Sequence, residues 1–135
     1  MAIKGMSKEV QDAMEKQKIF PFATASKDGV PNVVPIGFLM EGRDGNIWVI
    51  DNYMEKTLKN VRENPKASFY IWEPGFTESY QVKCSVKVED SGKDYEFAVD
   101  LAHKKKETYP AKTLFKLTVD EIYYVTPGAN AGKKL

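Results

Sequence analysis

Residues 47–61 read IWVIDNYMEKTLKNV, a β-branched and aromatic run that leads directly into a helix start. The first part, Ile47–Ile50, predicts a strand because these residue types favour the pleated backbone. Asn52 is a candidate N-cap, and Glu55 would then stand at the third helical position, as in a capping box. The unpaired N–H groups of such a helix start, with the positive end of the helix dipole behind them, favour a bound anion.

Two side chains of the same turn add to this predicted anion site. Lys56 supplies a positive charge and Thr57 a hydroxyl donor. Together with the backbone amides they can meet on one phosphoryl group. A capped surface helix that happens to carry Lys and Thr is the alternative interpretation, and the spacing alone leaves both open.

Composition limits the classes of function that fit. The chain has 135 residues, which predicts one domain over residues 1–135. Lys and Arg number 20 against 19 Asp and Glu, a net charge of +1, which does not favour nucleic acid or an anionic membrane as partner. The absence of a long apolar segment or a signal-peptide core predicts a cytoplasmic protein. One cysteine and one histidine, Cys84 and His103, leave too few soft ligands for a metal site, and both are expected to be structural.

Hydrophobic periodicity predicts three helices and a larger number of strands. The helices are one capped by Ser7, one that ends at Asn64-Pro65, and one over Tyr95–Lys105. The strands are Phe20–Ala25, Asn32–Met40, Ile47–Ile50, Ala67–Trp72, Gln81–Glu89, Thr113–Val119 and Ile122–Val125. This order lacks the regular strand-helix alternation of a doubly wound sheet, so it predicts a mainly β, α+β fold: a small antiparallel barrel with peripheral helices.

Three local features carry further expectations. Pro35 interrupts the second strand and, because proline cannot donate to a ladder, predicts a sheet edge or a bulge. Trp48 and Val49 point to opposite sides of their strand, so one of them is expected to face outward or into an interface. Residues 128–135 are expected to be loose.

Three segments resemble one known family. They read FATASKDGVPNVVP over 22–35, KTLKNVRENPKA over 56–67 and DEIYYVTPG over 120–128. In order and spacing they are similar to the split β-barrel flavin-binding proteins related to pyridoxamine phosphate oxidase, which include small FMN-binding proteins. The likeness extends over residues 18–128 and implies a split antiparallel β-barrel.

The resemblance implies an FMN held at the interface of a homodimer, with its phosphate on the start of the second helix. By position, Lys56 and Thr57 would bind the phosphate, and Asp51 and Asn52 would face the ribityl chain or the phosphate. The flavin ring would be lined by Val34, Pro35, Ile36 and Ile50. Where some relatives have glycines, this chain has Asn52 and Tyr53, which brings Tyr53 close to the cofactor.

The resemblance also implies an FMN-dependent oxidoreductase or an electron carrier, with no catalytic residue identified. The chain lacks the arginine-rich phosphate pattern and the carboxyl-terminal substrate segment of the vitamin-forming oxidase, so pyridoxamine phosphate oxidation is not expected. No Ser, Cys or His cluster indicates a hydrolase. Two alternatives remain open: the same fold with a deazaflavin cofactor or haem, and a non-enzymatic small β-barrel that binds nucleic acid through lysines and aromatic residues.

Overall fold

The computed structural model describes residues 2–135, which form one seven-stranded antiparallel sheet and three helices. The elements are α1 (Lys8–Lys16), β1 (Phe20–Ala25), β2 (Pro31–Ile36), β3 (Leu39–Glu41), β4 (Ile47–Asp51), α2 (Lys56–Glu63), β5 (Lys66–Ile71), β6 (Tyr80–Glu89), α3 (Lys93–Lys105) and β7 (Thr113–Tyr124). The strand order is β2-β1-β5-β6-β7-β4-β3. None of these helices is both long and apolar enough to cross a membrane.

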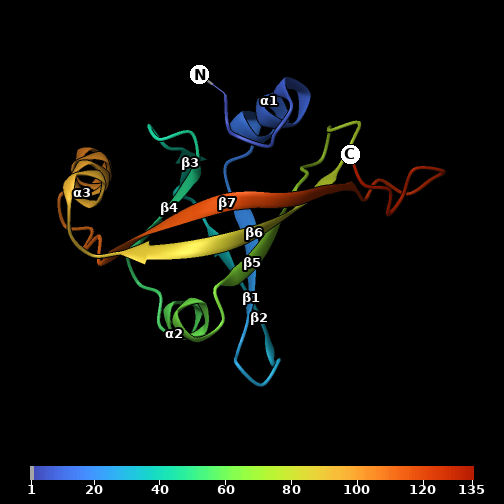
Figure 1. Cartoon of the computed structure of the whole chain (residues 1–135). Helices are drawn as coiled ribbons and strands as arrows, with labels where there is room; N and C mark the ends of the chain where they lie inside the picture. The colour runs from blue at the N-terminus through green and yellow to red at the C-terminus, as the bar shows by residue number, and fades with distance from the viewer. Residues whose placement is uncertain (1) are drawn as a thin grey trace.

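The sheet curls because its two edge strands are neighbours in the chain. β2 and β3 lie at opposite ends of the strand order, yet only Gly37 and Phe38 separate them. The chain therefore steps from one edge to the other, and the sheet closes toward a half-barrel (Figure 1). This confirms the split antiparallel barrel with peripheral helices. It also corrects the single strand predicted over Asn32–Met40, which breaks at Gly37 to make this step.

β4 is buried on both of its faces. Ile47 and Val49 belong to the main core, whereas Trp48 and Ile50 pack in a second cluster with Ala98 and other residues of α3 and its flanks. The expectation that Trp48 or Val49 faces outward is wrong, because α3 covers the outer side of β4 (Figure 1). An all-apolar run without alternation is the pattern of a strand covered on both sides.

The carboxyl-terminal part of the chain is more regular than predicted. β7 is one strand rather than two, with Asp120 as a bulge: Glu121 pairs with Lys83 and Val119 with Cys84. The bulge absorbs the polar break that suggested two strands. Residues 128–135 are not loose either, since Leu135 N donates to Ile122 O at 2.9 Å, and the tail thereby pairs with the free side of β7.

Other expectations are confirmed. The Ser7 hydroxyl caps α1 by accepting from Val10 N, and Pro35 lies in an edge strand opposite Pro21. Cys84 is 1% exposed, and burial raises the pKa of its thiol to about 12. A thiol held neutral in this way behaves as a small hydrophobic side chain, so Cys84 belongs to the core as predicted.

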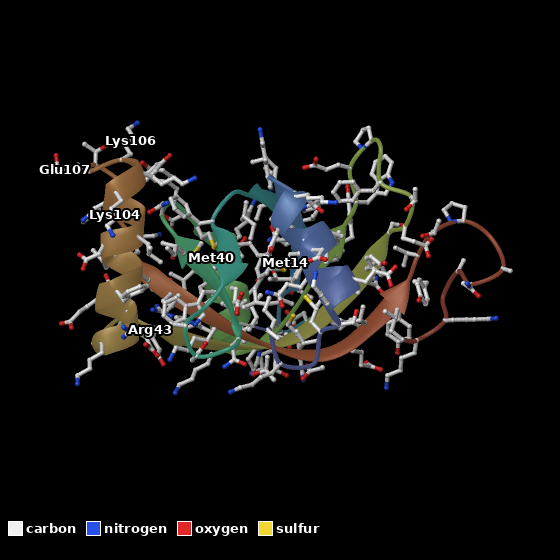
Figure 2. The ribbon with its side chains drawn as sticks, turned by 90° about the horizontal axis from the view of Figure 1, so that it is seen from above. Met14, Met40, Arg43, Lys104, Lys106 and Glu107 are labelled. Carbon is white, nitrogen blue, oxygen red and sulfur yellow. The ribbon has the colours of Figure 1, made fainter. Side chains whose placement is uncertain are left out.

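A cluster of charges fixes α3 to the sheet. Lys116 Nζ lies 2.6 Å from Asp94, 3.0 Å from Glu89 and 3.7 Å from Asp44. Arg43 donates to the same Asp94 at 2.8 Å and lies beside the amino end of α3 in Figure 2. Hydrogen bonds from Lys116 and Arg43 lower the pKa of the Asp94 carboxyl. Lys116 therefore joins β7, α3 and the loop before β4.

We expect Lys116→Met to lower the free energy of unfolding by about 1–2 kcal/mol, because three carboxylates lose their shared cation in a partly screened site. Urea denaturation monitored by circular dichroism measures the change. Lys87→Met is the matched control: Lys87 also lies near Glu89, at 3.5 Å, but its side chain is 75% exposed, so we expect a change within about 0.5 kcal/mol. Equal losses in the two variants would contradict a special role for Lys116.

Candidate functional site

A cleft lies where β2, the end of β4 and the start of α2 meet. It has a volume of about 910 Å³ and is also lined by the segment between α1 and β1 and by the carboxyl end of α3 with its following loop. This size is in the range of cofactor sites. The cleft runs along the edge strand β2, from Asn32 beside α2 to Gly37 and Phe38 at the other end.

The structure brings almost all of the sequence-predicted site residues to this cleft. Those that line it are Val34, Pro35, Ile36, Ile50, Asn52, Lys56 and Thr57. Tyr53, expected near the cofactor, lines it too and is 69% exposed. Asp51 does not line the cleft.

Asp51 has a different place from the one expected. Its side chain is fully buried, with 0% exposure. Oδ1 accepts from Met54 N at 2.8 Å, and Oδ2 accepts from the Thr113 hydroxyl at 2.9 Å. Lys112 Nζ lies 4.0 Å from the same carboxylate. Asp51 therefore shapes the turn between β4 and α2 from behind the cleft.

The helix start differs from the predicted capping box. α2 begins at Lys56, its N-cap is Glu55, and no side chain caps it. The prediction of Asn52 as N-cap is wrong, because Asn52 Oδ1 accepts from Ala111 N at 2.9 Å instead. Helix N-termini leave their first N–H groups without intrahelical partners. Without a capping side chain, these amides remain available at the end of the cleft where Lys56 and Thr57 stand.

A polar network presents the Thr57 hydroxyl to the cleft. Asn32 Nδ2 donates to Thr57 Oγ1 at 3.1 Å and to Thr24 Oγ1 at 3.2 Å, and Asn60 Nδ2 donates to Thr24 at 3.0 Å. Since the Thr57 oxygen already accepts, its hydroxyl proton is directed to another acceptor. Sequence reasoning missed Asn32, although it stands on the same strand face as Val34 and Ile36 and period-two alternation was a usable signal.

Aromatic side chains line another part of the cleft, next to the turn that leads into α2. Tyr109 packs edge-on against Phe38, with ring centroids 5.5 Å apart, and against Tyr53 at 6.4 Å. Lys105 and Lys18 also line the cleft. Sequence reasoning missed Lys105, Tyr109 and the segment of Lys18, because they come from distant segments and no local motif marks them. His103 does not line the cleft, and its Nε2 lies 3.0 Å from Tyr109 O.

Edge-strand geometry gives the cleft a backbone surface as well. β2 pairs with β1 on one side only. An edge strand leaves a row of N–H and C=O groups without sheet partners. Such groups can pair with the polar edge of a bound ring. Among residues 2–135 no cluster of three or more His, Cys, Asp or Glu side chains is arranged to hold a metal ion.

Comparison with known proteins points to one family. The sequence matches the family model of pyridoxamine 5'-phosphate oxidase over residues 6–126. It is also 32% identical over 130 residues to an uncharacterised protein of Methanocaldococcus jannaschii. The matched region covers 95% of this chain and 86% of that protein.

Solved structures share the fold at low identity. HupZ of Group A Streptococcus has a TM-score of 0.79 at 24% identity and covers 94% of this chain and 99% of its own. An FMN-binding protein of Syntrophomonas wolfei has a TM-score of 0.67 at 16% identity, with 90% of each chain covered. The haem storage protein HutZ of Vibrio cholerae has a TM-score of 0.68 at 13% identity, with 92% of this chain and 95% of that chain covered. An F420 reductase has a TM-score of 0.64 at 16% identity, with 87% of this chain and 98% of that chain covered. These likenesses show the fold, and the names show that its cofactors differ.

Asp51 and Lys56 differ in their expected effect on stability, because Asp51 is buried behind the cleft and Lys56 is exposed at its wall. We expect Asp51→Asn to lower the free energy of unfolding by about 1.5–3 kcal/mol, because its amide would oppose donors that now meet a buried carboxylate. Lys56→Met, at an exposed position, should change it by less than about 0.5 kcal/mol. Urea titrations of the ligand-free protein measure both. A destabilisation by Lys56→Met as large as that by Asp51→Asn would contradict this division.

Proposed function

This chain belongs to the pyridoxamine 5'-phosphate oxidase family, and we propose that it binds FMN in the β2–α2 cleft and serves as an oxidoreductase or electron carrier. The observation that carries the proposal is the end of the cleft at α2. There the uncapped helix amides, the Lys56 ammonium and the Thr57 hydroxyl converge beside an otherwise largely apolar wall. A phosphate monoester on a long, flat organic group has this same distribution of polarity.

The donor set at α2 fits the phosphate of FMN. Backbone N–H groups at a helix start, with the dipole behind them, bind anions well. Asn32 fixes the Thr57 side chain at 3.1 Å, so its hydroxyl needs little reorganisation to donate. Val34, Pro35, Ile36 and Ile50 supply the wall for the ring, and Asn52 stands between wall and helix start.

The flavin itself would supply hydride or single-electron chemistry, and the protein supplies binding, orientation and electrostatic tuning. The residues of the cleft suit these tasks. Lys56 would offset phosphate charge, the free edge of β2 would offer main-chain carbonyl groups and the Val33 amide to the polar ring edge, and the apolar wall would exclude water. Reaction with pyridoxamine phosphate is not part of the proposal, since no arginine of the described residues lines the cleft.

The choice of FMN over haem rests on the side chains that could bind haem iron. His103 is the chain's one histidine; it does not line the cleft, and its ring contacts Tyr109 O. Cys84 is buried in the core. Among the described residues the cleft thus offers neither of the side chains that most often hold haem iron. Family membership likewise favours a cofactor site over a nucleic-acid-binding barrel.

A homodimer with FMN at its interface is part of the proposal. The outer surface of β2, β1 and β5 carries exposed apolar side chains, with Val33 64% and Tyr70 43% exposed. Ile19, 55% exposed, lines the cleft beside this surface, and Gln17 links Ile19 O to Tyr70 O by hydrogen bonds. A second copy seated here would cover both the apolar surface and the mouth of the cleft. A cytoplasmic location, also proposed, agrees with an unpaired cysteine.

Cofactor binding tests the proposal directly. We expect purified protein incubated with FMN to keep it through gel filtration and to show the paired visible bands of an oxidised flavin, which bleach on reduction. Lys56→Met should weaken FMN binding about tenfold, the equivalent of about 1.5 kcal/mol for a charge-assisted hydrogen bond. Titration by quenching of FMN fluorescence measures the dissociation constant.

Lys59→Met is the control for Lys56→Met, since Lys59 is an exposed residue of α2 that does not line the cleft. Its FMN affinity should equal that of the unchanged protein. Tight binding of a deazaflavin or of haem in preference to FMN would overturn the choice of cofactor. Unchanged FMN affinity in Lys56→Met would place the phosphate elsewhere.

The dimer has its own test. We expect Val33→Glu to raise the dimer dissociation constant at least about tenfold, because a charge would be buried in the interface. Sedimentation equilibrium measures this constant. Val30→Glu, at a similarly exposed valine before β2 (63%), is the control. A monomer for the unchanged protein, with FMN bound, would contradict an interfacial site.

A further inference from the structure

The polar contacts behind Thr57 extend beyond the wall of the cleft. Thr57 and Asn32 line the cleft, whereas Thr24 of β1 and Asn60 of α2 do not line it and are buried. α2 lies next to the β1–β2 hairpin (Figure 1), and these four side chains join the helix to both strands by hydrogen bonds. We call the four side chains the Thr24 network.

Thr24 is the acceptor at the centre of this network. Its Oγ1 accepts from Asn60 Nδ2 at 3.0 Å and from Asn32 Nδ2 at 3.2 Å. A hydroxyl oxygen has two acceptor lone pairs, so these two bonds use both of them. The Asn32 amide nitrogen is thereby held between two hydroxyl groups, and its second N–H donates to Thr57 Oγ1 at 3.1 Å.

The Thr57 hydroxyl is left with a proton to donate. Its oxygen accepts from Asn32, so the hydroxyl proton is directed elsewhere. This proton meets no acceptor among residues 2–135, although the side chain is only 2% exposed. Buried polar groups normally have a hydrogen-bond partner. Since Thr57 lines the cleft next to Lys56, these observations indicate that the acceptor is an oxygen atom of the ligand.

We propose that Thr24 is a positioning residue for the phosphate of FMN and acts through Asn32 and Thr57. It holds the Asn32 amide nitrogen toward Thr57, which makes the Thr57 hydroxyl a donor that is already turned toward the phosphate. The inference deepens the proposed function and rests on it. It assigns part of the preference for FMN over riboflavin to a side chain that does not line the cleft.

A group that can only donate suits a phosphate in particular. The Lys56 ammonium and the uncapped amides of α2 are donors as well. A phosphate monoester carries up to two negative charges and accepts through three oxygens, so it can take a bond from each of these groups. If the Thr57 hydroxyl turned to donate to Asn32 instead, the phosphate would lose one of its donors.

Riboflavin, which is FMN without its phosphate, separates positioning from a general effect on the fold. We expect Thr24→Val to weaken FMN binding about fivefold and to leave riboflavin affinity unchanged, because valine keeps the shape of threonine but cannot accept from Asn32. Thr24→Ser should restore FMN binding, since serine keeps the hydroxyl. Quenching of flavin fluorescence measures both dissociation constants.

A double variant tests whether Thr24 acts through Thr57. Thr57→Val alone should weaken FMN binding about tenfold. Adding Thr24→Val to it should cause no further loss, because the hydroxyl that Thr24 positions is already gone. Losses that multiply in the double variant would overturn the inference. So would equal losses of FMN and riboflavin affinity in Thr24→Val, since they would indicate a structural role only.

Thr126→Val is the matched control. Thr126 Oγ1 also accepts a hydrogen bond, from Ser79 N at 2.7 Å, but Thr126 does not line the cleft and is not part of the Thr24 network. Its affinities for FMN and for riboflavin should equal those of the unchanged protein. A loss of FMN affinity as large as that in Thr24→Val would contradict a specific role for Thr24.

Asn32→Leu keeps the inference testable if Thr24→Val does not fold, because Asn32 is only partly buried and lies in the edge strand β2. This change removes the donor to Thr57, so the ratio of FMN affinity to riboflavin affinity should fall about fivefold. An unchanged ratio would overturn the inference. Failure of the unchanged protein to bind FMN is a separate result, which overturns the proposed function.

Discussion

The buried carboxylate of Asp51 is the interaction on which the cleft depends. It accepts from Met54 N, which fixes the turn into α2, and from the Thr113 hydroxyl, which fixes the start of β7. Lys112 N donates to Asp51 O at 2.8 Å, so the backbone of the same residue holds the loop after α3. One residue thus fixes both the turn into α2 and the loop that carries Tyr109. A buried charge is stable only with such complete hydrogen bonding.

The loop after α3 is held in an unfavourable conformation by the same junction. Ala111 has φ of 44°, in the left-handed region that non-glycine residues rarely adopt. Its N–H donates to Asn52 Oδ1 at 2.9 Å, and its carbonyl accepts from the Tyr95 hydroxyl at 2.7 Å. These bonds offset the strain. Asn52 therefore does more than line the cleft, because it also positions the loop that carries Tyr109.

Local pattern predicted the parts of the fold that local physics decides. The Ser7 cap, the β1–β2 hairpin and the alternation of β6 follow from a few neighbouring residues. The errors arise where a distant segment decides. Trp48 is buried because α3 arrives from elsewhere in the chain, and Asn52 bonds to Ala111 rather than capping α2. The bulge at Asp120 also needs its partner β6 to exist, so a polar dipeptide looked like a break between strands.

The same distinction divides the cleft. Its α2 end is made by consecutive residues, so the family resemblance and the helix start both found Lys56 and Thr57. The aromatic residues Phe38, Tyr53 and Tyr109 meet only in the folded protein, and no short motif contains them. Solved proteins with this fold include an FMN-binding protein, a haem storage protein and an F420 reductase. The part of the cleft at α2 is thus set by local sequence, whereas its aromatic part depends on contacts between distant segments.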